Sequence, residues 1–337
     1  MARNDLGAIA QAMVATGKGI LAADESTGTI GKRFDSIQVE NNEIERRNYR
    51  DLLFQTKALN SYISGVILYD ETLRQRSADG TSFVDLLSRQ GILPGIKVDM
   101  GAKNLALCPG ETITEGLDNL AIRCDEYVQF GAKFAKWRAV IDIAKNIPSA
   151  TCVVANAHAL ARYAAICQQS GLVPIVEPEV LMDGDHDIDR CEEVTEATLS
   201  AVYDALRIHK VVLEHTVLKP SMVISGKKCA KQANVAEVAE RTVRILKRTV
   251  PAAVAGVVFL SGGQSDTLAT EHLNAMNQLG PLPWPVSFSY GRALQQAALK
   301  AWHGKPENVT TAQAALAHRS HMNSLASIGQ YQSSLEK

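Results

Sequence analysis

The chain has none of the bulk features that are typical of nucleic-acid-binding, membrane or secreted proteins. Its 337 residues carry a formal net charge of −1, which excludes binding to nucleic acid or to a membrane surface through bulk electrostatics. No window reaches the roughly 18 uninterrupted apolar residues of a membrane span, and the first residues lack the apolar core of a signal peptide. We therefore expect a cytoplasmic protein without nucleic-acid or membrane partners.

Motifs for metals and cofactors are also missing. The six cysteines form no C-x-x-C pair. Such a distribution is typical of reduced thiols in a cytosolic protein. The eight histidines form no H-E-x-x-H motif, and the acidic stretch 183–189 lacks the glycine that an EF-hand needs at its sixth position. We expect this stretch to be a solvated loop that leads into a helix, and we expect neither a metal nor another cofactor.

The chain alternates short β-type runs with longer helical patterns, in a composition (46% apolar, 21% charged) typical of a globular protein. The candidate strands are 19–24, 63–70, 94–99, 134–141, 173–177, 217–220, 256–261 and 286–290. Clear helical patterns cover 43–57, 156–170, 189–209 and 235–250. Ile44, Leu52 and Leu53 are expected on the apolar side of the first helix, and Asn234 stands where the last would be N-capped.

Eight βα units in a chain of this length predict an α/β protein with a (β/α)8 TIM barrel. The alternative is a doubly wound open sheet, which usually has G-x-G-x-x-G after its first strand. At that position this chain has Asp24-Glu-Ser-Thr-Gly-Thr. No linker-like stretch divides the sequence. We predict a single barrel domain over residues 1–337, with an N-terminal helix and a short C-terminal helical tail.

Polar side chains stand late in, or just after, almost every candidate strand. Barrel enzymes place catalysis at the carboxyl ends of their strands, so these residues are expected to converge. They are Asp24, Lys97, Lys136, Arg138, Glu177, Glu179, Lys219, Ser261 and Arg292. Residues two apart on a strand share a face, so Lys136 points with Arg138, and Glu177 with Glu179. The sequence therefore predicts a polar site at that end of the barrel.

Lys219 follows the apolar pair Val217-Leu218 and precedes Pro220, which ends strand pairing. A lysine in isolation is more often a surface residue, but an apolar setting favours loss of its proton. A neutral amine is a nucleophile towards carbonyl groups. A second interior lysine, Lys136, is expected to favour the neutral amine further by like-charge repulsion. Imine chemistry is the function that this pattern indicates.

Three carboxylates are candidates for moving protons. Imine formation passes through a carbinolamine that must lose water, so an acid has to protonate the departing hydroxyl. Glu177 and Glu179 are close enough in sequence for one to remain protonated, although an ordinary ion-paired strand end is the alternative. Asp24 is either a helix N-cap or a base that deprotonates a substrate hydroxyl.

Two groups of residues are candidates for binding phosphate. Ser261-Gly262-Gly263 follows an apolar strand, and glycines let backbone N–H groups approach phosphate oxygens closely, although Gly-Gly is also common in ordinary turns. Gly291 and Arg292 occupy the equivalent place in the next unit, where barrels commonly bind phosphate. A second candidate anion site consists of Ser26, Lys97 and Arg138. Two phosphate sites that flank one amine predict a bisphosphorylated substrate.

Seven segments of the chain resemble those of class I fructose-1,6-bisphosphate aldolases. They run in order through nearly the whole sequence, which makes the resemblance highly specific. The segments are Leu-Ala-Ala-Asp24-Glu-Ser-Thr-Gly, Gly-Ile-Lys97-Val-Asp, Phe-Ala-Lys136-Trp-Arg138, Val-Glu177-Pro-Glu179, Leu-Lys219-Pro-Ser-Met-Val, Leu-Ser261-Gly-Gly-Gln-Ser and Ser-Tyr-Gly-Arg292-Ala-Leu-Gln.

The resemblance implies a metal-independent lyase of glycolysis and gluconeogenesis, commonly a homotetramer, that acts on sugar phosphates. The implied reaction is reversible aldol cleavage of fructose 1,6-bisphosphate to dihydroxyacetone phosphate and glyceraldehyde 3-phosphate. By this resemblance Lys219 forms the imine with C2 of the open-chain ketose. Glu177 is the acid–base group, assisted by Lys136 and Glu179, and Asp24 takes the proton of the C4 hydroxyl.

The same resemblance implies two phosphate subsites. The residues similar to the C1-phosphate subsite are Ser261, Gly262, Gly291 and Arg292. Those similar to the C6-phosphate subsite are Ser26, Lys97 and Arg138, with Arg33 as a neighbour.

Two other functions stay open at this stage. A phosphate-binding barrel isomerase needs a carboxylate base but no imine, and a non-catalytic scaffold predicts loss of Lys219, Glu177 and Asp24, which are all present.

Many animal aldolases also have a flexible tail that closes with a tyrosine and aids enamine protonation. This chain ends in Leu-Glu-Lys and its last tyrosine is Tyr331, so the resemblance assigns no proton donor to the enamine.

Overall fold

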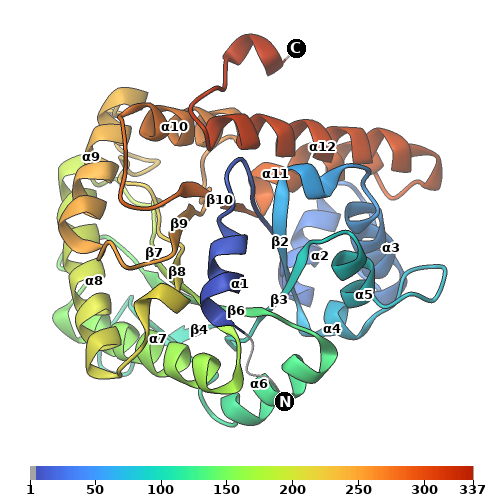
Figure 1. The fold of residues 1–337 in the computed structure, drawn as a ribbon. Coiled ribbons are helices and arrows are strands. Elements are labelled where there is room, and N and C mark those ends of the chain that lie inside the picture. Colours follow the sequence, from blue (N-terminus) through green and yellow to red (C-terminus); the bar gives the residue numbers. More distant parts are fainter. Residues whose placement is uncertain (1–4, 337) are drawn as a thin grey trace.

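The computed structural model describes residues 5–336, and its main strands close into one parallel barrel (Figure 1). The strand order around the barrel is β1-β10-β9-β8-β7-β6-β3-β2. The strands are β1 (Gly19–Ala23), β2 (Ile63–Leu68), β3 (Leu93–Lys97), β6 (Phe134–Ile141), β7 (Val173–Val180), β8 (Val217–Leu218), β9 (Gly256–Phe259) and β10 (Val286–Tyr290). The predicted (β/α)8 fold is confirmed.

Several strand ends differ from the prediction. Strands β6 and β10 have the predicted bounds, whereas β1, β2, β3, β8 and β9 end one or two residues early. Strand β8 stops at Leu218 because Pro220 cannot continue the ladder, yet the N–H of Lys219 still donates to the Val176 carbonyl at 2.8 Å. Strand β7 continues beyond Glu177 because it pairs with β6 along its whole length, across Pro178.

Helices surround the barrel and connect successive strands (Figure 1). Those in residues 5–336 are α1 (Leu6–Met13), α2 (Thr27–Asp35), α3 (Glu43–Phe54), α4 (Asp70–Arg74), α5 (Phe83–Arg89), α6 (Leu120–Phe130), α7 (Ala150–Ser170), α8 (Ile188–Ile208), α9 (Val235–Thr249), α10 (Asp266–Gln278), α11 (Arg292–Trp302) and α12 (Val309–Ala326). Short 3-10 turns are η1 (Leu59–Ser61), η2 (Leu213–His215), η3 (Pro306–Asn308) and η4 (Ser333–Glu336). An antiparallel hairpin that the sequence did not predict joins β4 (Ala102–Asn104) and β5 (Thr112–Thr114).

The four helices predicted from periodicity are present, with some corrected ends. The side chain of Asn234 caps α9 as expected, and α7 starts six residues early because Ser149 caps it there. The acidic stretch 183–189 is the loop before α8, and Asp187 caps that helix. The placement of Ile44 was wrong: it is 62% exposed, because it lies in the first turn of α3 on the side away from the core.

Apolar side chains fill the amino-terminal half of the barrel. Inward-facing residues from six strands pack together there with helix α1, which lies in the middle of the ring of strands in Figure 1. Leu6 and Met13 are the contributions of α1, and both are buried. Helix α1 therefore closes this end of the barrel, and the opposite end remains available for a site.

The polar residues continue this apolar layer along the same strand faces. Residues two apart on a strand point to the same side, so each apolar interior residue predicts the direction of a polar one. The pairs are Phe134 and Lys136, Ile175 and Glu177, and Val217 and Lys219. The register aligns them, because Lys136 and Val217 both lie opposite Ile175. The packing of the apolar layer in the amino-terminal half of the barrel therefore determines the position of the polar layer above it.

The expected N-terminal helix is α1, and the chain runs from α12 into the turn η4 near its end. The predicted domain extent, residues 1–337, includes residues 1–4 and 337, which lie outside the described residues, and it stays a prediction. Within the described part, none of the helices combines the length and the apolar character that a membrane crossing requires.

We expect Gly95→Ala to destabilise the barrel. A Cβ atom built on Gly95 would overlap the ring of Phe134, which is fully buried in the interior layer, and overpacking of this kind costs about 1–3 kcal/mol. Urea unfolding would measure the loss. Gly28→Ala is the matched control, because its Cβ meets nothing within 4 Å and alanine is the better helix former. Equal stability of Gly95→Ala and the wild type would contradict the packing argument.

Candidate active site

A cavity of 240 Å³ opens at the carboxyl ends of the strands. All thirteen residues that the sequence analysis proposed for the site line it: Asp24, Ser26, Arg33, Lys97, Lys136, Arg138, Glu177, Glu179, Lys219, Ser261, Gly262, Gly291 and Arg292. Larger hollows of 450 and 650 Å³ lie elsewhere on the molecule, but neither is lined by a lysine of the described chain. Among these three cavities, as lined by the described residues, only the one at the strand ends combines lysines with carboxylates.

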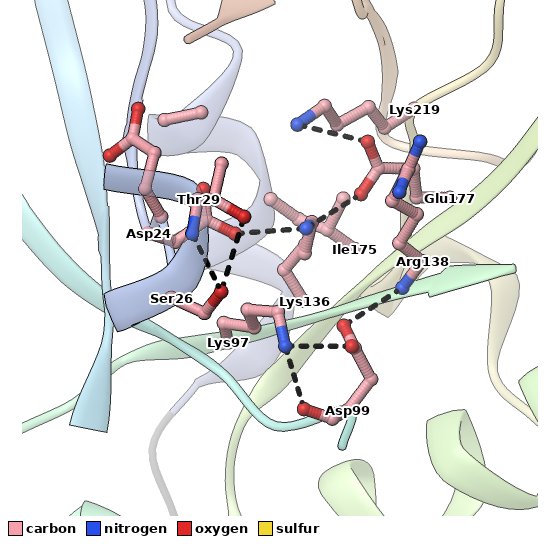
Figure 2. A network of polar contacts seen from close by, with 12 residues as sticks. Asp24, Ser26, Thr29, Lys97, Asp99, Lys136, Arg138, Ile175, Glu177 and Lys219 are labelled. Carbon is pink, nitrogen blue, oxygen red and sulfur yellow. Dashed lines mark hydrogen bonds and ion pairs between the residues drawn. The ribbon is translucent and has the colours of Figure 1, made fainter. Parts of the chain in front are cut away.

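A chain of ion pairs joins residues that line this cavity (Figure 2). The Nζ atom of Lys219 lies 3.2 Å from Oε1 of Glu177, and Nζ of Lys136 lies 3.1 Å from Oε2 of the same carboxylate. Lys136 also contacts Oδ2 of Asp24 at 2.9 Å. The side chains of Lys219 and Glu177 are 5% and 4% exposed, so these charges interact with little screening by water.

The pKa values of two of these groups follow from their neighbours. Burial disfavours the ammonium of Lys136, but the carboxylates of Asp24 and Glu177 outweigh that cost and raise its pKa. Burial likewise raises the pKa of Asp24, but the charges of Lys136 and Lys219 outweigh it and hold this pKa well below the ordinary value. These contacts favour a protonated Lys136 and an ionised Asp24. Asp24 is not the helix N-cap that was the alternative, because Ser26 caps α2.

The position of Glu177 changes the expected electrostatics. The sequence predicted direct repulsion between Lys136 and Lys219, whereas the structure places one carboxylate in contact with both ammonium groups. Glu179 was expected to share a proton with Glu177, but it forms a hydrogen-bonded ion pair with Arg138. Each glutamate thus has its own cationic partners, which removes the crowding on which that expectation depended.

One candidate anion site lies where α2 begins. Ser26 caps this helix, and its Oγ atom lies 3.1 Å from Oγ1 of Thr29. Lys97 comes from the end of β3, and its ammonium pairs with Asp99 at 2.7 Å (Figure 2). Arg138 completes the group from β6. A helix N-terminus with two nearby cations suits a phosphate.

The second candidate anion site joins the loops after β9 and β10. Arg292, the first residue of α11, donates through Nη2 to the Gly262 carbonyl at 3.0 Å. Gly262 has φ +53°, a conformation that glycine adopts without strain. A Cβ atom built on Gly291 would lie 3.6 Å from Nη2 of Arg33. Arg33 therefore lies beside this second site, although the resemblance had grouped it with Ser26.

Five residues that line the cavity were not proposed from the sequence: Ala22, Glu25, Thr29, Leu260 and Ser289. Ser289 lies on β10, two residues before Gly291, which directly follows that strand, so the alternation of side chains along a strand could have found it. Its hydroxyl is buried with no partner in the described chain. Glu25 follows Asp24 directly, and strand periodicity would have pointed it away from the site. It enters the cavity lining because the chain leaves the strand at Ala23 and turns into α2.

Tyr331 lies away from the cavity lining. It is buried, and its hydroxyl donates to Oε1 of Glu336 at 2.9 Å. Burial and the Glu336 charge raise the pKa of this hydroxyl, so Tyr331 is a structural residue in this conformation.

Among residues 5–336, no group of three or more histidine, cysteine, aspartate or glutamate side chains could hold a metal ion.

Comparison with known proteins identifies the family. The family model described as "Fructose-bisphosphate aldolase class-I" matches residues 5–337. A probable class 1 fructose-bisphosphate aldolase of Xanthomonas campestris is 60% identical over 98% of this chain and 99% of its own length. Cytosolic fructose-bisphosphate aldolase 6 of Arabidopsis thaliana is 60% identical over 94% of this chain and 88% of its own length.

A solved structure agrees with these sequences. The fructose-bisphosphate aldolase of Plasmodium falciparum, crystallised with TRAP and a small-molecule inhibitor, superposes with a TM-score of 0.96. It is 52% identical and covers 97% of this chain, which covers 95% of that one. The expected lyase activity in glycolysis, cleavage of fructose 1,6-bisphosphate, is the function of this family. Family models, sequences and fold agree that the chain belongs to the class I fructose-bisphosphate aldolases.

Proposed function

We propose that Lys219 is the amine that forms an imine with C2 of fructose 1,6-bisphosphate, and that Glu177 moves the protons of this step. The observation that carries the proposal is the buried Lys219 ammonium, 3.2 Å from Glu177 inside a cavity lined by two groups of anion-binding residues. An isomerase needs a carboxylate base but no imine, whereas an amine beside an acid–base group is what imine formation requires.

Imine formation uses the carboxylate of Glu177 twice. Glu177 accepts a proton from Lys219, and the freed amine attacks the C2 carbonyl to give a carbinolamine. Glu177 then returns the proton to the C2 hydroxyl, which leaves as water, and the nitrogen keeps a positive charge as the protonated imine. Lys136 stays protonated throughout and stabilises the carboxylate each time its negative charge returns. Glu179, which lines the same cavity and pairs with Arg138, assists this step.

Cleavage uses Asp24 as the base. Asp24 removes the proton of the C4 hydroxyl, the C3–C4 bond breaks, and its electron pair neutralises the protonated imine to form an enamine. Glyceraldehyde 3-phosphate leaves as the aldehyde. Because the charge on the Lys219 nitrogen lowers the pKa of Asp24, loss of that charge raises the proton affinity of Asp24 during the step in which it accepts a proton. Protonation at C3 and hydrolysis then release dihydroxyacetone phosphate.

The two anion sites hold the two ends of the substrate. Ser261, Gly262, Gly291 and Arg292 bind the C1 phosphate, and the position of Arg33 beside Gly291 supports its inclusion in this group. Ser26, Lys97 and Arg138 bind the C6 phosphate. Fixing both ends places C2 at the amine of Lys219, which supplies the orientation that an intramolecular reaction requires.

Three wider properties belong to the same proposal. The protein works without a metal or another cofactor, because Lys219 supplies the electron sink that a metal would otherwise provide. It assembles as a homotetramer, as the resemblance implies, and takes small sugar phosphates as substrates. It acts in the cytoplasm, a location supported by a plant relative that is named cytosolic.

Borohydride trapping tests the nucleophile. Reduction in the presence of dihydroxyacetone phosphate should label Lys219 and inactivate the wild-type enzyme. Lys219→Met should lose the label and at least about 10³-fold in kcat while the fold survives. The matched control is Lys133→Met, which removes an amine outside the cavity. A label at another lysine, or none with activity retained, would favour an isomerase or another mechanism.

Lys136→Met tests the electrostatic control of Asp24. In the wild type Asp24 remains ionised below pH 3.8, its ordinary pKa. Without Lys136 the burial cost remains while the main counter-charge is lost, so the pKa of Asp24 rises and the base becomes protonated at higher pH. We expect kcat to fall about 10²-fold or more and the acid limb of its pH profile to move to higher pH. An acid limb that stays in place would show that Lys136 does not control Asp24.

Two substrates distinguish the phosphate sites. Lys97→Met should raise KM for fructose 1,6-bisphosphate roughly tenfold, because a charge-assisted phosphate contact is lost. It should leave KM for fructose 1-phosphate, which has no C6 phosphate, within about twofold of the wild type. Arg292→Met should raise KM for both substrates. Equal effects of Lys97→Met on the two sugars would reverse the assignment.

A further inference from the structure

Glu25 is a buried carboxylate held between two arginines. Its Oε1 atom accepts a hydrogen bond from Nη1 of Arg33, and its Oε2 atom accepts one from Nη2 of Arg50 at 2.6 Å. The side chains of Glu25 and Arg50 are each 4% exposed, whereas that of Arg33 is 23% exposed. The network therefore extends from the interior, at Arg50, to the cavity, at Arg33.

Further contacts fix the Glu25 carboxylate in place. The side-chain amide of Gln295 donates to Oε1 of Glu25 at 2.9 Å and to the Ala22 carbonyl at 2.7 Å. Gln295 in turn accepts from the hydroxyl of Tyr49 at 3.1 Å. These partners come from β1, α3 and α11 and are buried. Glu25 therefore has one orientation, set by three elements of the barrel wall.

The guanidinium of Arg33 divides its donors between Glu25 and the cavity. Nη1 faces Glu25, while Nη2 lies 3.6 Å from where a Cβ atom of Gly291 would be. A guanidinium has five N–H donors in a rigid plane, so anchoring one edge orients the other. A free arginine would lose side-chain conformational entropy on binding a phosphate, and an anchored one has already lost it.

We infer that Glu25 is a positioning residue for the phosphate site: it holds the Arg33 guanidinium against Gly291, ready to bind the C1 phosphate of the substrate. The inference rests on the proposed function, because it uses the anion site assigned there. Glu25 touches no reacting atom and acts only through Arg33. Its opposite partner, Arg50, supports the carboxylate from the interior and has no part in substrate binding.

The test compares four variants of the full chain: Glu25→Gln, Arg33→Gln, the double variant, and Arg50→Gln as the matched control. KM and kcat for fructose 1,6-bisphosphate and the thermal midpoint are measured for each. Glu25→Gln should raise KM roughly tenfold, the value of one charge-assisted hydrogen bond, and change kcat by less than about twofold. The double variant should match Arg33→Gln within about twofold, because both changes remove one interaction.

The control separates positioning from stability. Arg50→Gln also breaks a buried ion pair with Glu25, so its thermal midpoint should fall, but its KM should stay within about twofold of the wild type. An unchanged KM in Glu25→Gln overturns the inference. The inference is also overturned if the increase in KM of the double variant equals the product of the increases in the two single variants. A KM in Arg50→Gln as high as that of Glu25→Gln overturns it as well.

Two additional measurements keep the test decisive. If Glu25→Gln does not fold, Glu25→Asp replaces it: the shorter side chain draws the carboxylate away from Arg33, so KM should rise by less than in Arg33→Gln, and a wild-type KM overturns the inference. Borohydride labelling of Lys219 in Arg33→Gln at saturating substrate separates the two claims. An unchanged KM in Arg33→Gln with normal labelling rejects the role of Glu25 and leaves the imine chemistry intact.

Discussion

The structure depends on one requirement: charges inside a barrel of apolar strands must be paired. Lys136 meets it by lying between Asp24 and Glu177, at 2.9 and 3.1 Å. Breaking such a pair leaves an uncompensated buried charge, which costs more than the pair itself contributes. Lys136 and Glu177 lie on β6 and β7, and Asp24 directly follows β1, so the ion pairs form only when the register of the barrel is correct. The same contacts hold Asp24 as a carboxylate and Lys136 as a cation.

The same rule extends to the cations that line the cavity. Lys97 pairs with Asp99, Arg138 with Glu179, and Arg33 with Glu25. In each pair the carboxylate is the more buried partner, and the cation reaches towards the cavity. In the proposed function, the two phosphates of the substrate meet cations whose orientation the paired carboxylates have already set, and these carboxylates offset part of the positive charge of the cavity. Binding then costs little reorganisation.

Much of this arrangement could be predicted from the chain. The alternation of strands and helices indicated the barrel, and the period of two along a strand indicated that Lys136, Glu177 and Lys219 share an interior face. The strand ends were less predictable, because they depend on pairing with neighbours: β7 continues past Pro178 only because β6 lies alongside. Ile44 was misplaced for a related reason, since a helix pattern alone does not say which turn reaches the core.

The sequence by itself determined the fold, the family and the identity of the polar residues at the strand ends, because these follow from local periodicity and from motifs in order. Only the tertiary structure decided which charge faces which. In the structure, Glu177 lies in contact with both Lys136 and Lys219, and Arg33 lies beside Gly291. Glu25 lies between two arginines. Those contacts join residues far apart in the chain, and their strength depends on distances and burial that no local pattern contains.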